Sequence, residues 1–284
     1  MKNNISRRDF LKTAAAGTAG VAGGAALLTT SGCEDDLFSS FAIPRFAMNT
    51  LGTTSYSATM AEYNLSQHAE WTGWVKNSGD RVKEATIAHE NNSRRISGFN
   101  WNYNLIADNT INAWCMPGAN IAFYEGIMPT CYNETGTAIV MGHEVAHAVY
   151  NHGGQRMAQQ LTLQLGITLF SAALAARFED PNDAEIQNIA LQVFGVGVQV
   201  GGQLALLHYS RKHEYEADKM GLIYAARAGY DPVEAPDFWR RMSALGSSAT
   251  PEFLRTHPSN ANRIRELEKA IPEAREYYQE SQRS

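Results

Sequence analysis

The sequence has no excess of basic residues. Its 24 lysines and arginines are outnumbered by 29 aspartates and glutamates, which gives a formal net charge of −5 at pH 7. Binding to a phosphate backbone needs a basic patch or stripe, so the composition argues against nucleic-acid partners. Internal repeats are also absent. Hydrophobic residues nevertheless make up 44% of the chain, which is enough for the core of an ordinary globular domain.

Long uninterrupted apolar runs are scarce as well. The most apolar region of the later chain, residues 157–209, is broken near EDPND into two segments, 161–176 and 189–209. The first segment is too short to span a bilayer comfortably, and the second contains three glutamines and several glycines. We therefore expect two buried helices here, with a membrane hairpin as the alternative.

The N-terminus is typical of an export signal. SRRDFLK, with its paired Arg7 and Arg8, precedes a run of small and apolar residues from Thr13 to Leu28, and this order resembles the twin-arginine type. The run is short and rich in alanine and glycine, so a membrane-spanning anchor is the weaker alternative. Residues 1–32 are therefore predicted to be a signal peptide, and the mature protein to be exported to the periplasm or cell envelope.

Cysteine is scarce, with three residues in the chain. Cys33 follows the small residues of TSGC, which resembles a lipoprotein processing site, so a lipid on Cys33 is expected to anchor the protein to a membrane. Thr30 stands where such sites usually have leucine, which leaves plain cleavage as an alternative. Residues 33–59 are then a tether, and residues 60–284 the folded domain. Cys115 and Cys131 form either a disulfide or two separate buried thiols.

Hydrophobic periodicity gives a coarse order of elements. Apolar residues at spacings of three and four predict a helix over residues 60–91. Alternating apolar and polar residues over 96–127 predict two or three short strands of an antiparallel sheet. A second helix is expected from about Thr135, after the cap-forming sequence NET, to the glycine pair at 153–154.

The motif HEVAH lies in that second helix. His143 and His147 are four residues apart, so both imidazoles project from one face and can bind a single metal ion. Glu144 lies beside them, within reach of a metal-bound water. The apolar residues around the motif indicate a buried helix, and buried histidines need partners. His152, five residues further on, is interpreted as a structural residue near the helix end.

A downstream segment, RKHEYEADKMG, offers the third ligand that a catalytic zinc site needs. Glu214 and Asp218 are four residues apart on a predicted helix and project from the same side. Glu214 suits the role of metal ligand. Asp218 suits that of the carboxylate which fixes the tautomer and orientation of a ligand imidazole.

HEVAH, HEYEAD, the strand-like NAWCMPG and the late THPSNANRI together resemble the HtpX/BepA/LoiP and Oma type of zinc peptidase, relatives of the CAAX prenyl proteases. The resemblance is nearest to small periplasmic lipoprotein members such as LoiP. It implies an α+β, mostly helical, zincin-like domain with a small antiparallel sheet beside the HExxH helix. It also implies zinc on His143, His147 and Glu214, with Glu144 as general base and Asp218 supporting the ligands.

The predicted function is zinc-dependent endopeptidase activity on unfolded or misassembled cell-envelope proteins. Glu144 would take a proton from the attacking water and deliver it to the leaving amine. His257 and Arg263 are candidates for stabilising the oxyanion, although a surface position is the expected one for Arg263. His257 is also a candidate for regulating access to the metal. The alternatives are a non-catalytic, zinc-stabilised chaperone or binding lipoprotein and an integral-membrane peptidase.

Overall fold

The computed structural model describes residues 45–91, 93–156, 211–245, 250–258 and 261–283. All of these except residues 155–156 belong to one compact unit. The predicted signal peptide, Cys33 and the apolar region 157–209 lie outside the described residues. Among the residues that are described, no helix combines the length and the apolar character needed to cross a membrane.

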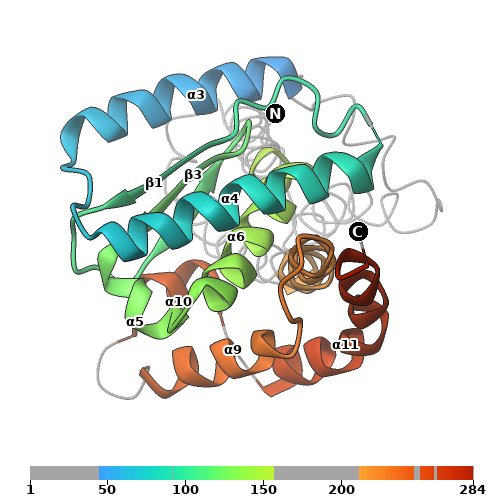
Figure 1. Ribbon diagram of the computed structural model, residues 1–284. Coiled ribbons are helices and arrows are strands. Elements are labelled where there is room, and N and C mark those ends of the chain that lie inside the picture. The colour runs from blue at the N-terminus through green and yellow to red at the C-terminus, as the bar shows by residue number, and fades with distance from the viewer. Residues whose placement is uncertain (1–44, 92, 157–210, 246–249, 259–260, 284) are drawn as a thin grey trace, which may run out of the picture. The chain divides into compact units, whose positions relative to one another are not determined.

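The unit is mostly helical and contains one small sheet (Figure 1). Its elements, in chain order, are α3 (Arg45–Glu62), α4 (Ala69–Glu90), β1 (Asn102–Ile106), β2 (Ala113–Met116), β3 (Asn120–Tyr124), η1 (Glu125–Ile127), α5 (Met128–Cys131), α6 (Glu134–Val149), a helical segment over 211–227, α9 (Glu234–Leu245), α10 (Glu252–Thr256) and α11 (Ala261–Ser281). The prediction of a mostly helical α+β domain is therefore confirmed.

The sheet is mixed rather than antiparallel, which corrects the sequence-based expectation. Its strand order is β1-β3-β2, in which β2 pairs antiparallel with β3 and β1 pairs parallel with it. The parallel pairing arises because the residues between β1 and β2 carry the chain across the sheet before β2 and β3 form a hairpin. The hairpin turn contains Gly118 and Ala119 with φ of 84° and 56°, so an alanine adopts a left-handed conformation that glycine adopts more readily.

The two faces of the sheet pack against different helices. Ile121 and Phe123 of β3 belong to the main hydrophobic core, together with residues of α4 and α6. Ala122 and Tyr124, which point the other way because side chains alternate along a strand, belong to a small second core with Tyr56 of α3. Figure 1 shows α3 on the opposite side of the sheet from α4.

The helix α3 occupies most of the segment predicted to be a tether. Its buried residues include Met48 and Tyr56, and the Tyr56 hydroxyl donates a hydrogen bond to the carbonyl of Ile121 at 3.1 Å. Residues 45–59 are thus part of the folded unit, and the tether interpretation applies at most to the residues before them. The predicted helix over 60–91 is found in two parts, the end of α3 and α4.

The two cysteines of the described region are both free thiols. Cys115 lies in β2 and Cys131 at the end of α5. Burial raises the pKa of the Cys131 thiol to about 12 and that of Cys115 well above its usual value. Of the two alternatives left by the sequence, the structure has two separate thiols, of which Cys131 is buried and Cys115 is partly buried.

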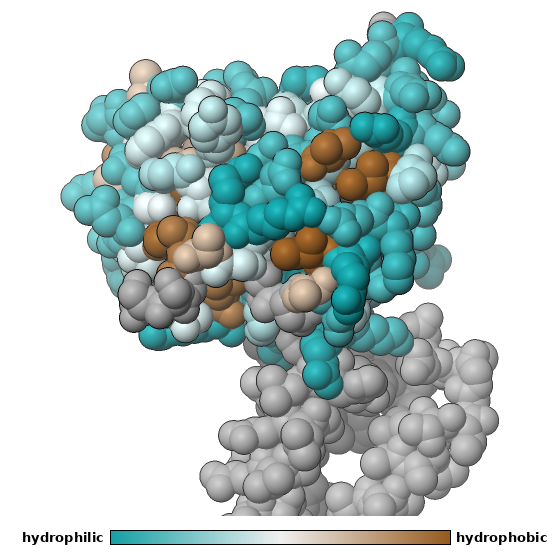
Figure 2. All heavy atoms as spheres, turned by 90° about the horizontal axis from the view of Figure 1, so that it is seen from below, coloured by the Kyte–Doolittle hydropathy of each residue, from teal (hydrophilic) through white to brown (hydrophobic). Residues whose placement is uncertain are grey.

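Apolar side chains are largely confined to the interior. On the face seen in Figure 2, hydrophobic residues form small separate patches among hydrophilic ones. Single exposed apolar residues of this kind are normal on soluble surfaces. Several titratable side chains are buried instead, where α6 meets the 211–227 segment.

Candidate metal centre

The helix α6 carries the HEVAH motif into the core. It begins at Glu134, one residue before the predicted start, and the side chain of Asn133 caps it by accepting a hydrogen bond from the backbone of Gly136 at 2.9 Å. Almost every residue of α6 is buried, including His143 and Glu144. The helix can be buried all round because its many small residues allow neighbouring elements to approach closely.

The closest approach is between Gly142 of α6 and Gly221 of the 211–227 segment. A Cβ atom added to Gly142 would lie 2.4 Å from the carbonyl oxygen of Gly221, and one added to Gly221 would lie 2.6 Å from the backbone nitrogen of His143. Larger residues at this crossing would separate the two helices. The glycine pair therefore brings the acidic residues of the second helix within reach of the histidines of the first.

Four side chains meet at this crossing with metal-ligand geometry. Potential ligand atoms of His143, His147, Glu214 and His257 all lie within 4.8 Å of one another. His147 Nε2 is 3.0 Å from His143 Nε2 and 3.3 Å from Glu214 Oε1. Two imidazoles and one carboxylate are a donor set typical of catalytic zinc sites. The residues present therefore fit a metal ion.

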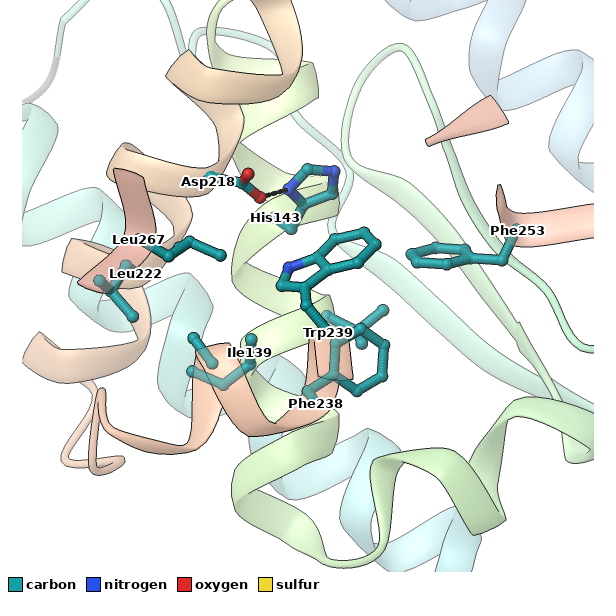
Figure 3. A pocket seen from close by; sticks show the side chains of 10 residues that line it. Ile139, His143, Asp218, Leu222, Phe238, Trp239, Phe253 and Leu267 are labelled. Atoms are coloured by element: carbon teal, nitrogen blue, oxygen red, sulfur yellow. Dashed lines mark ion pairs between the residues drawn. The ribbon is translucent and has the colours of Figure 1, made fainter. Parts of the chain in front are cut away.

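Asp218 contacts the first histidine of the HEVAH motif. Its Oδ1 lies 3.0 Å from Nδ1 of His143 (Figure 3), so the other ring nitrogen, Nε2, faces the cluster. Asp218 and Glu214 extend from the same side of their helix, as their spacing of four residues predicts. Glu214 lies in the cluster, and Asp218 lies behind His143.

Arg263 is not at the surface, which corrects the sequence-based expectation. Its side chain is only 1% exposed. Its Nη1 is 2.9 Å from Glu214 Oε2, and its Nη2 donates to Asp218 Oδ1 at 2.8 Å. The guanidinium also lies 3.7 Å from the ring centroid of Trp239. Two buried carboxylates and an aromatic face thus compensate a buried charge. Positions 263, 267 and 274 form the buried face of α11. Their spacing of four and seven residues along one helix face is the sequence signal for the burial of Arg263, and it was overlooked.

Glu144 lies beside the cluster and is 2% exposed. Its Oε1 atom is buried without a hydrogen-bond partner among the described residues, and Nε2 of His257 lies 3.4 Å away from it. Burial raises the pKa of this carboxyl group. An unsatisfied buried carboxylate oxygen is costly, and it marks a position where a water or substrate atom can bind.

His257 ends α10 and lies inside the cluster. Its Nδ1 is 3.1 Å from both His143 Nε2 and Glu214 Oε2. A backbone hydrogen bond of 3.1 Å from Phe253 to the carbonyl of Ile111 anchors α10 to the segment that leads into β2. The sequence left two interpretations of His257, a position near the metal and packing against the C-terminal helix. The structure has its imidazole beside His143, Glu214 and Glu144.

Burial and neighbouring charges shift the pKa values of the side chains in the cluster. Burial alone would raise the pKa of Glu214, but the neighbouring His257, Arg263 and His147 hold it well below its usual value. Burial lowers the pKa of His143, yet the hydrogen bonds to Asp218 and Glu214 outweigh it and raise this pKa to about 9. Burial keeps the pKa of His147 well below its usual value.

The wall behind His143 is apolar. A small cavity there is lined by side chains of α6, α9, α10, α11 and the 211–227 segment, among which Phe238, Trp239 and Phe253 are the largest (Figure 3). Such a wall excludes water from one side of the cluster and strengthens electrostatic interactions within it. Access to the metal position is therefore expected from the side of Glu144 and β2.

His152 belongs to the centre, although the sequence indicated only a residue near a helix end. It is 1% exposed, and its Nδ1 lies 2.9 Å from Nδ1 of His147. Its Nε2 lies 2.9 Å from Oε2 of Glu216. A histidine five residues after HEVAH is not on the same face of an ideal helix, so helical spacing gave no indication of this contact.

Comparisons with known proteins agree with this geometry. Residues 73–271 match the model of a family described as peptidase family M48. Residues 4–24 match the model of the twin-arginine translocation pathway signal sequence, so the N-terminal segment is an export signal of the predicted type.

Three similar proteins illustrate the range of relatives. The chain is 34% identical over 227 residues to mitochondrial metalloendopeptidase OMA1 of Schizosaccharomyces pombe, which covers 78% of this chain and 60% of that protein. Against human metalloendopeptidase OMA1 the identity is 31%, over 63% of this chain and 34% of that protein. Against the beta-barrel assembly-enhancing protease of Escherichia coli the identity is 26%, over 68% of this chain and 37% of that protein. The matches thus span between a third and three fifths of these relatives.

Proposed function

The chain belongs to peptidase family M48, and on that premise we propose that it is a zinc-dependent endopeptidase that cleaves unfolded or misassembled proteins of the cell envelope. The observation that carries the proposal is the buried cluster of His143, His147 and Glu214 with the unsatisfied carboxylate of Glu144 beside it. Two histidines and a glutamate are the ligands of well-known zinc peptidase sites, which keep a further position for water.

Each side chain has a distinct task in this proposal. Zinc, when bound, lowers the pKa of water to about 7 and polarises the scissile carbonyl. Glu144 takes the proton of the attacking water and delivers it to the leaving amine, a general acid and base role worth about 10²- to 10⁴-fold in rate. Asp218 holds the Nδ1 proton of His143 and so directs Nε2 toward the cluster.

Between the two candidates for the oxyanion, the contacts favour His257. Arg263 is already paired with both Asp218 and Glu214, so its charge is committed to holding the acidic helix in place. His257 lies beside Glu144 and close to the ligand atoms. Its imidazole can therefore reach either a substrate oxygen or the metal itself, and these two roles have opposite effects on activity.

The edge strand β2 supports unfolded polypeptide as the substrate. In the order β1-β3-β2, one side of β2 pairs with β3, and no strand of the described region pairs with its other side. Burial and, to a smaller extent, the charge of Glu144 raise the pKa of the Cys115 thiol of β2. Glu144 is therefore close enough to β2 to act on it electrostatically. An extended peptide can add to such an edge by main-chain hydrogen bonds that are largely indifferent to sequence.

The export signal and the cysteine that follows it set the proposed location. The twin-arginine match indicates transport across the cytoplasmic membrane. We propose that Cys33 then carries a lipid, which would hold the peptidase at a membrane surface. Envelope proteins that fail to fold or assemble are the substrates that such a position makes available.

The experiment that tests the function compares the mature protein with its Glu144→Gln variant on an unfolded test protein. The wild type should cleave it and the variant should not, although both should bind about one zinc per chain, because the substitution changes the base and no ligand. A folded form of the same test protein should be cut more slowly. Cleavage by Glu144→Gln at the wild-type rate would contradict the assignment of the base.

One observation favours a second candidate, a non-catalytic zinc-stabilised chaperone or binding lipoprotein. His257 is close enough to be a fourth protein ligand, and zinc with four protein ligands is typical of structural sites. The same comparison separates the two functions. A binder would retain zinc and cleave nothing in either form, whereas the peptidase loses cleavage only in the variant.

A further inference from the structure

The two histidines of HEVAH are supported in different ways. His143 contacts a carboxylate directly, through Asp218 at 3.0 Å. His147 contacts another imidazole, that of His152, with 2.9 Å between the two Nδ1 atoms. His152 in turn contacts the carboxylate of Glu216. Through Nδ1, on the side away from the cluster, both rings are therefore connected to an acidic residue of the 211–227 helix, His143 directly and His147 through a second ring.

The position of Glu216 explains why a second ring is needed. Glu214 and Asp218 are one helical turn apart and face α6, whereas Glu216 is two residues from each, which rotates it by about 200° around the helix axis. Its side chain is 39% exposed, against 4% and 6% for the other two. Its carboxylate therefore leaves the helix on another side and reaches the centre only through His152.

The backbone after α6 places His152 for this contact. The helix ends at Val149, and Asn151 adopts φ of 56°, a left-handed conformation that asparagine tolerates better than most residues. This turn redirects the chain so that His152 packs beside His147. The His152 ring also stacks on His213, with centroids 4.3 Å apart and planes 12° apart, which fixes the plane of the ring.

We propose that His152 and Glu216 are positioning residues that form a hydrogen-bonded relay and hold His147 with its Nε2 lone pair directed at the metal. This inference rests on the proposed function, because it takes His147 to bind zinc through Nε2. A neutral imidazole that binds through Nε2 carries its proton on Nδ1. That proton is donated to His152 Nδ1, so the proton of His152 resides on Nε2 and is donated to Glu216 Oε2.

The relay accounts for a contact that a packing role does not. A histidine that only filled space beside His147 would need no carboxylate, yet Glu216 lies within hydrogen-bond distance of its far nitrogen. A single metal-binding tautomer of His147 also dictates the direction of both hydrogen bonds. Groups that orient ligand histidines in this way typically change metal affinity by 10- to 100-fold when they are replaced.

The test measures zinc affinity of the full mature chain by competition with a chromophoric chelator. His152→Phe keeps a ring that can stack on His213 but has no ring nitrogen, and it should weaken zinc binding by about 10- to 100-fold. His152→Asn restores an acceptor near the Nδ1 position and should recover most of that loss. Glu216→Gln keeps the size of the side chain but removes its charge, and it should weaken binding less than His152→Phe does.

Glu273→Gln is the matched control. Glu273 of α11 is 47% exposed and pairs with Lys219 of the 211–227 helix, and it is not part of the contact between His152 and His147. It should bind zinc as tightly as the wild type. Thermal unfolding in the presence of excess chelator shows whether each metal-free variant is folded. If His152→Phe does not fold, Glu216→Gln decides the question.

The relay is wrong if His152→Phe holds zinc as tightly as the wild type. Where the phenylalanine variant does not fold, the relay is wrong if Glu216→Gln holds zinc as tightly as the wild type. Failure of the proposed function has a different signature, because then the wild type itself would take up no zinc, or would hold it without cleaving an unfolded protein. The ¹⁵N spectrum of zinc-loaded, histidine-labelled protein provides a second readout. The wild type should show His147 protonated at Nδ1, and protonation at Nε2 would overturn the relay.

Discussion

Gly142 and Gly221 touch where α6 crosses the 211–227 helix, with 2.4 Å between the position of an added Gly142 Cβ and the carbonyl oxygen of Gly221. The neighbour of Gly142 is His143, and Asp218 lies one turn before Gly221. The contact thus sets the distance between the histidines and the acidic residues of the site. The metal centre depends on two residues that have no side chain.

The first prediction concerns this crossing. Gly142→Ala should lower the free energy of unfolding by about 1–3 kcal/mol, the usual cost of overpacking a core, and should weaken zinc binding because the two helices move apart. Gly73→Ala is the control, since an added Cβ on Gly73 of α4 meets nothing within 4 Å. That change should be neutral or stabilising by up to about 1 kcal/mol. Chemical denaturation measures both, and equal stability of the two variants would contradict the prediction.

The second prediction assigns the third ligand. Glu214→Ala should reduce bound zinc from about one per chain to well below one after dialysis, because only two histidines remain from the proposed set. Glu266→Ala, on the exposed side of α11, removes a carboxylate that pairs with Lys269 and should leave the zinc content unchanged. Metal analysis by mass spectrometry distinguishes them. Undiminished zinc in Glu214→Ala would remove Glu214 from the ligand set.

The third prediction concerns the buried charge of Arg263. Arg263→Met should destabilise the metal-free protein by about 3–5 kcal/mol, because Asp218 and Glu214 are left buried without their cation. Arg240→Met is the matched control. Arg240 also pairs with two carboxylates, Asp237 and Glu268, but is 52% exposed, and exposed pairs contribute about 0–1 kcal/mol.

Denaturant unfolding in excess chelator measures the difference between the two arginine variants. Added zinc should restore part of the stability of Arg263→Met, because a cation bound by Glu214 replaces some of the lost positive charge. If the two variants unfold at the same denaturant concentration, Arg263 does not have the structural role that its contacts indicate.

The parts of the site that follow helical spacing could be predicted from the sequence. His143 with His147, and Glu214 with Asp218, are four residues apart, and this spacing alone puts each pair on one face of a helix. The family resemblance supplied the expectation that these two faces meet. Neither motif alone indicates that its helix crosses a helix about 70 residues away in the sequence. The glycine pair explains the crossing once the structure is known.

The parts that depend on tertiary contacts could not be predicted. Arg263 was expected at the surface because arginine is rarely buried unless it is paired, and its partners lie in another helix. His152 depends on the left-handed conformation of Asn151, which the sequence does not specify. The parallel pairing of β1 with β3 depends on the path of the connecting segment, since strand periodicity gives the faces of a strand but not its direction.

The last prediction concerns His257. Its Nδ1 lies 3.1 Å from His143 Nε2 and 3.1 Å from Glu214 Oε2, so the ring occupies the space between the proposed ligands and Glu144. A zinc ion with three protein ligands keeps a position that water, substrate or another imidazole can fill. The imidazole of His257 is placed to fill it in the resting protein, and a substrate would then have to displace it.

His257→Ala should therefore raise the rate of cleavage of an unfolded substrate and leave the zinc content near one per chain. His68→Ala is a suitable control, because His68 caps the start of α4 through the backbone of Trp71, away from the centre. A lower rate with zinc retained would contradict the inhibitory role and would instead assign His257 to the oxyanion. The two roles also differ in kinetics. Removal of a competing ligand should mainly lower KM, whereas loss of a contact made only in the transition state lowers kcat and kcat/KM equally.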